Sequence, residues 1–150
     1  MSNEVGPLLR QLCDKLMSPV PTPDQAASWV GEPVEKETRY WTLKPKSAAV
    51  DTAWLRFENL AIGDGVPTTL DVHFREPWKT NRAELERLFG ADAAWLEHVV
   101  TRRTLCFEVK GDGDAKGTVC VRVDLPGADD APEWTVRSAL IRRIHGPRRA

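Results

Sequence analysis

Two spacings of hydrophobic residues follow one another along the chain. Near the start, hydrophobic residues recur every three or four positions, as on one side of an α-helix: Val5, Leu8, Leu9, Leu12, Cys13 and Leu16. Hydrophobic and polar residues then alternate one by one over 40–43, 54–58, 70–75, 105–110 and 119–124, which is typical of half-buried strands. The pattern predicts an N-terminal amphipathic helix followed by an antiparallel sheet.

Two short helices are predicted by the residues at their ends. Each has an N-cap residue, a Gln or Glu three residues later that completes a capping box, and a glycine that stops the helix. These residues are Thr22, Gln25 and Gly31 in the first helix and Asn81, Glu84 and Gly90 in the second.

The two capped helices begin segments of similar pattern, at 22–75 and 81–124. Leu55 and Phe57 match Leu105 and Phe107, and a Gly-Asp-Gly turn follows in both segments. Internal duplication explains the match, but any capped helix followed by a hairpin looks alike. Both explanations predict one α+β domain over residues 1–150. It has an antiparallel sheet built from two helix-then-hairpin units, helices on one face, and the extra N-terminal helix.

The segment 133–144 fits two structures. Trp134 and Val136 favour a strand, whereas Arg137 and Ile141 favour a helix. We expect a strand.

Charge and composition narrow the function classes. The chain has 21 basic and 22 acidic residues, a net charge of −1, and five of its arginines lie from Arg137 onward without an acid. A mildly acidic body with a short flexible basic tail at 146–150 argues against nucleic acid as a partner. Neither a membrane-spanning apolar run nor a secretion signal is recognisable, which predicts a cytoplasmic protein without a membrane partner.

The cysteines and histidines predict neither a metal site nor a cofactor. Their spacing matches no metal-binding motif. Cys13 falls in the hydrophobic stripe of the first helix, while Cys106 and Cys120 alternate onto the other side of their strands. All three are expected to be reduced in the cytoplasm.

One face of the predicted sheet is a candidate interaction surface, which we call the outer face. Trp and Arg often anchor protein interfaces, and both occur there among acidic residues. The predicted partner-binding residues are Tyr40, Trp54, Arg56, Glu58, Asp71, His73, Arg75, Glu108 and Arg122. Alternatively, the first helix or segment 133–144 covers this face.

These observations favour a non-enzymatic protein that binds another protein, a toxin or secreted effector, through its sheet face. The element order resembles that of repeated α/β inhibitor proteins and bacterial toxin-immunity proteins. A secretion chaperone is an alternative that requires a helix at 133–144 and predicts a dimer. A third is a small enzyme that uses Cys106 or Cys120 with His73, or a ligand-binding domain with a pocket between sheet and helices.

Overall fold

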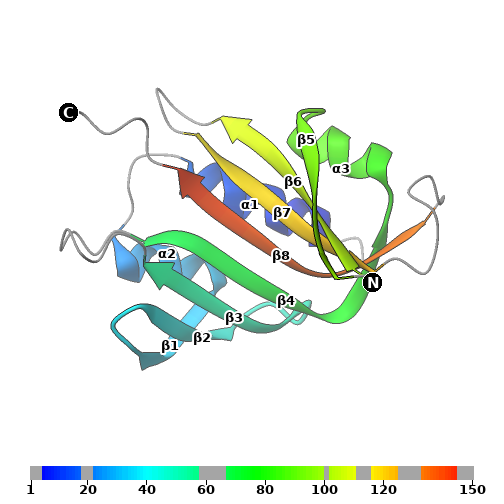
Figure 1. Ribbon diagram of the computed structural model, residues 1–150. Coiled ribbons are helices and arrows are strands. Elements are labelled where there is room, and N and C mark those ends of the chain that lie inside the picture. Colours follow the sequence, from blue (N-terminus) through cyan, green and yellow to red (C-terminus); the bar gives the residue numbers. More distant parts are fainter. Residues whose placement is uncertain are drawn as a thin grey trace, which may run out of the picture.

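The computed structural model describes residues 5–17, 22–57, 67–99, 102–110, 116–124 and 133–144. In these ranges the chain is an α+β fold with one eight-stranded antiparallel sheet and three helices (Figure 1). The helices are α1 (Val5–Leu16), α2 (Pro23–Val30) and α3 (Arg82–Phe89). The strands are β1 (Gly31–Lys36), β2 (Tyr40–Pro45), β3 (Val50–Phe57), β4 (Pro67–Thr80), β5 (Ala93–Val99), β6 (Arg102–Lys110), β7 (Lys116–Asp124) and β8 (Trp134–Ile144).

The caps of α2 and α3 confirm the predicted helix starts. The Thr22 hydroxyl accepts from the Gln25 amide at 3.1 Å, and the Gln25 side chain accepts from the Thr22 amide at 3.0 Å. The Asn81 side chain accepts from the Glu84 amide at 2.8 Å, but the Glu84 carboxylate instead accepts a hydrogen bond from Thr80. The capping box is therefore complete only in α2.

The sheet has the strand order β1-β2-β3-β4-β8-β7-β6-β5, and all neighbours are antiparallel. Strands β4 and β8 therefore lie at the centre, and β1 and β5 form the two edges. Segment 134–144 is the central strand β8, which confirms the strand expected there.

The topology bears on the predicted repeat. Each of α2 and α3 precedes four strands, and the two sets of four meet where β4 pairs with β8. The sequence comparison, however, matches residues of β3 with β6 and of β4 with β7, which are not at equivalent places in this order. The duplication stays a prediction.

One face of the sheet, the core face, is packed against the helices. Hydrophobic residues from the alternating segments 54–58, 70–75, 105–110 and 119–124 form it and are buried: Leu55, Phe57, Leu70, Val72, Phe74, Leu105, Phe107, Val119, Val121 and Val123. Buried side chains of all three helices join the same cluster. The packing confirms that the hydrophobic side chains of these strands point toward the core, as the alternation predicts.

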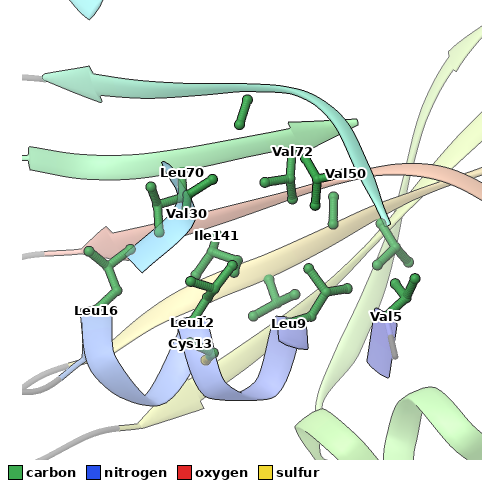
Figure 2. Close-up of a cluster of buried hydrophobic side chains, with 14 of the residues drawn as sticks. Val5, Leu9, Leu12, Cys13, Leu16, Val30, Val50, Leu70, Val72 and Ile141 are labelled. Carbon is green, nitrogen blue, oxygen red and sulfur yellow. The ribbon is translucent and has the colours of Figure 1, made fainter. Parts of the chain in front are cut away.

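Helix α1 crosses behind β7 and β8 in Figure 1. Its hydrophobic stripe points at the sheet in Figure 2, where Leu9 and Leu12 lie near Val72 and Ile141. Arginine side chains fix its position, because Arg10 donates to the Leu88 carbonyl at 2.8 Å and Arg143 donates to the Leu16 carbonyl at 3.0 Å. None of the helices in the described ranges is long and apolar enough to cross a membrane.

Three of the five C-terminal arginines lie in β8, in the segment expected to be a strand, and not in the predicted tail. Arg137 and Arg143 lie within β8, where Arg137 pairs with Asp124 and Arg143 holds the end of α1. The segment 146–150 lies outside the described residues.

Two strands of the sheet, β1 and β5, were not predicted from the sequence. β1 contains Pro33 and charged residues, and its register shifts between Pro33 and Glu35, so it lacks a clean alternation. In β5, Trp95 and Leu96 are adjacent, which blurs the two-residue period.

Candidate functional site

The outer face of the sheet carries no helix among the described residues. The helices pack on the core face, and 134–144 is part of the sheet, so neither segment covers the outer face as the alternative required. Six predicted site residues lie in strands β2, β3, β4 and β7: Tyr40, Trp54, Arg56, Asp71, His73 and Arg122. Among the described residues, no helix therefore covers these side chains.

Four of these residues form a contact cluster, which we call the Asp71 cluster. The Asp71 carboxylate lies 3.3 Å from the Arg56 guanidinium and 3.4 Å from Nε2 of His73. Trp54 is the cross-strand partner of Asp71, and its ring meets the His73 ring edge to face at a centroid distance of 5.1 Å. The sheet register thus brings together four residues from two strands.

Burial differs within the Asp71 cluster. The Asp71 side chain is only 16% exposed, whereas Arg56 and His73 are 48% and 41% exposed. A carboxylate held below two basic groups orients them toward solvent and restricts their rotamers. The cluster therefore presents a cationic and an aromatic group with little conformational freedom left to lose on binding.

A second row of the outer face runs through β8. Ser138 is the cross-strand partner of His73 on one side and of Arg122 on the other, and it is 7% exposed. Arg122 is exposed and has no ion pair within the described part of the chain. Sequence reasoning missed Ser138 and its neighbour Leu140, although the alternation Ser138, Leu140 indicated the face once β8 was treated as a strand.

The remaining predicted residues lie around this centre. Arg75 turns away, because it donates to the Ala48 carbonyl at 3.2 Å and lies 3.8 Å from Asp51. Glu108 is exposed on β6, opposite Thr118, three strands from the Asp71 cluster. Glu58 lies outside the described residues.

Cys106 and Cys120 form a disulfide across β6 and β7, so the expectation that they are reduced is wrong in this structure. The backbone bond from the Glu108 amide to the Asp92 carbonyl makes Ala93 and Phe107 a non-hydrogen-bonded pair. The amide and carbonyl of Cys106 then point toward β5. Its pair with Cys120 is consequently the close, non-hydrogen-bonded kind, with Cα atoms 4.0 Å apart.

The structure does not bring a cysteine to His73. β8 lies between the strands of Cys120 and His73, which places them roughly 10 Å apart at the usual strand spacing. Cys13 is buried in α1, where desolvation raises the pKa of its thiol to about 11. The Cys/His arrangement considered from the sequence is therefore not assembled.

Other ligand sites are poorly developed in the described ranges. These residues contain no group of three His, Cys, Asp or Glu side chains placed to hold a metal ion. A cavity between α1, α2 and the sheet measures about 30 Å³, room for little more than one water. A more open cleft of about 260 Å³ lies on the helix side, lined in part by Trp78, Glu84 and Leu88.

Comparison with known proteins adds little to this geometry. No family model matches the chain, and no curated protein matches it. A solved structure, ORF14 from Sulfolobus islandicus filamentous virus, is similar over 52% of this chain and 69% of that chain, with 11% identity and a TM-score of 0.41. No family is assigned.

Proposed function

We propose that the protein is a non-enzymatic binding domain of the inhibitor or toxin-immunity type, which blocks a partner protein with the outer face of its sheet. One observation carries this proposal: the broad outer face is free of helices in the described ranges and has the Asp71 cluster near its centre. Protein interfaces are often anchored by Trp and Arg side chains in this kind of ordered setting.

The side chains of the outer face support this proposal. Trp54 and His73 supply ring surface, Arg56 and Arg122 supply charge, and all four project from paired strands. A sheet face changes shape little on binding, so little ordering free energy opposes association. The partner surface expected here is an acidic patch with an apolar centre.

The alternative functions have less support. A secretion chaperone requires a helix where β8 lies, and the cysteine enzyme requires a thiol beside His73. Small-molecule sites usually measure roughly 300 Å³ or more. The cavity beneath α1 and α2 is far smaller, and the open cleft of about 260 Å³ on the helix side is slightly smaller.

The disulfide also bears on the cellular compartment of the protein. The cytoplasmic prediction rested on the absence of a recognisable secretion signal and membrane-spanning run, and reduced cysteines were expected from it. The Cys106–Cys120 disulfide favours an oxidising compartment instead. The descent of segments 22–75 and 81–124 from one helix-then-hairpin unit stays a proposal beside chance similarity, because the sequence match pairs strands at non-equivalent places. The matching places of α2 and α3 before their strands support it.

Charge reversal at Arg122 tests the proposal. The partner would be isolated by co-purification and titrated by calorimetry against the wild type, Arg122→Glu and Arg87→Glu. Arg122→Glu is expected to weaken binding at least about ten-fold, because an acidic partner surface would be repelled. Since Arg122 holds no described ion pair, the melting temperature should not change.

Arg87→Glu is the matched control, since Arg87 is 73% exposed on α3, on the helix side. It should bind as the wild type does. Equal affinity for all three proteins, or a loss only in Arg87→Glu, would place the binding surface elsewhere.

A further inference from the structure

The two edge strands of the sheet differ in how they resist pairing with another strand. β1 has Pro33, a register shift and exposed charged residues such as Glu32 and Glu35. Proline, irregular register and charge are the usual means by which a sheet edge avoids further pairing. The β1 edge is therefore protected.

From Ala93 to Leu96, β5 has no proline, no register shift and no charged residue. Its register with β6 is regular from Ala93 to Glu97 and contains no proline. Because Ala93 and Phe107 are a non-hydrogen-bonded pair, the amide and carbonyl groups of Ala93, Trp95 and Glu97 point away from β6. Within the described ranges, no strand pairs with β5 on that side.

We propose that β5 pairs with β5 of a second copy of this chain, antiparallel and about a two-fold axis at Trp95. This register places Trp95 opposite Trp95 of the second copy and Ala93 opposite Glu97. Both are pairs in which the outward backbone groups meet and exchange hydrogen bonds. The sheets of the two copies then form one continuous antiparallel sheet.

Residue chemistry favours a second copy as the occupant. The register sets Glu97 against an alanine rather than another acid, so like charges are not opposed. Trp95 is half-buried beside Trp134, at a ring distance of 5.4 Å, and gains a cross-strand aromatic neighbour. A net charge of −1 leaves little repulsion between copies.

Sedimentation velocity of the full chain over a concentration series tests the proposal. The wild type should reach twice the monomer mass, with a dissociation constant on the order of 10 µM for such a small interface. Ala93→Pro should stay monomeric, because proline removes an amide that faces the open edge and no ladder bond within the copy. Ala91→Pro, the same change just before β5, should still dimerise.

Hydrogen exchange keeps the test independent of whether the proline variant folds. The Trp95 amide should exchange fast in dilute wild-type protein and at least about ten-fold more slowly once the protein dimerises. A wild type that stays monomeric, a dimer that survives Ala93→Pro, or a Trp95 exchange rate independent of concentration would each overturn the proposal.

Discussion

Replacing Leu9 with alanine is expected to lower the free energy of unfolding by about 3 kcal/mol, as large-to-small changes in packed cores do. Leu9 is fully buried between α1 and the centre of the sheet, so the deletion leaves a cavity that the strands cannot close (Figure 2). Urea denaturation followed by tryptophan fluorescence measures the loss, because Trp78 and Trp134 are buried in the core.

Gln11→Ala is the matched control on the same helix. Gln11 is exposed, and the change should move the free energy of unfolding by no more than about 0.5 kcal/mol. Equal effects of the two substitutions would mean that α1 is not docked on the core face.

Removing the Cys106–Cys120 disulfide is expected to lower the free energy of unfolding by about as much as Leu9→Ala does. The two cysteines are 14 residues apart, and a closed loop of this size stabilises by about 3 kcal/mol in the chain-entropy model. The double variant Cys106→Ala/Cys120→Ala and the reduced wild type should lose the same free energy of unfolding in urea.

Thiol counting provides the control. Unfolded, non-reduced protein should show one thiol, Cys13, and reduction should add two more. In the native protein Cys13 should react very slowly at pH 8, because a pKa of about 11 leaves roughly one thiol in a thousand ionised. Three reactive thiols in unfolded protein without reductant would contradict the disulfide.

Much of the fold follows from local sequence patterns. The stripe that includes Leu9 and Leu12 predicts α1, and the alternation around Val72 or Val121 predicts which side of each strand is buried. These patterns are reliable because the spacing of the buried residues depends only on the helix or strand that contains them. They also predicted β8, where Trp134 and Val136 fit a strand.

Edges and cross-strand contacts were harder to predict. β1 is protected by Pro33 and charged residues, and those same residues hide the strand pattern. The disulfide depends on the register of β6 and β7, which no local pattern encodes, since a shift by one residue would place Cys106 and Cys120 apart.

The candidate site was predicted as a face, not as a set of contacts. Alternation placed Trp54, Arg56, Asp71 and His73 on the same side. Their grouping around Asp71 needed the β3–β4 register. Arg75 was on the same predicted face, yet its bond to Ala48 draws it out of the cluster.

The proposed function requires that a partner protein occupy the outer face. Covalent footprinting of the wild type, alone and with its co-purified partner, tests it most directly. Tyr40, Trp54 and His73 should lose labelling in the complex, while Trp29 on α2 should keep it. Protection of the helices with unchanged labelling of Trp54 and His73 would contradict it.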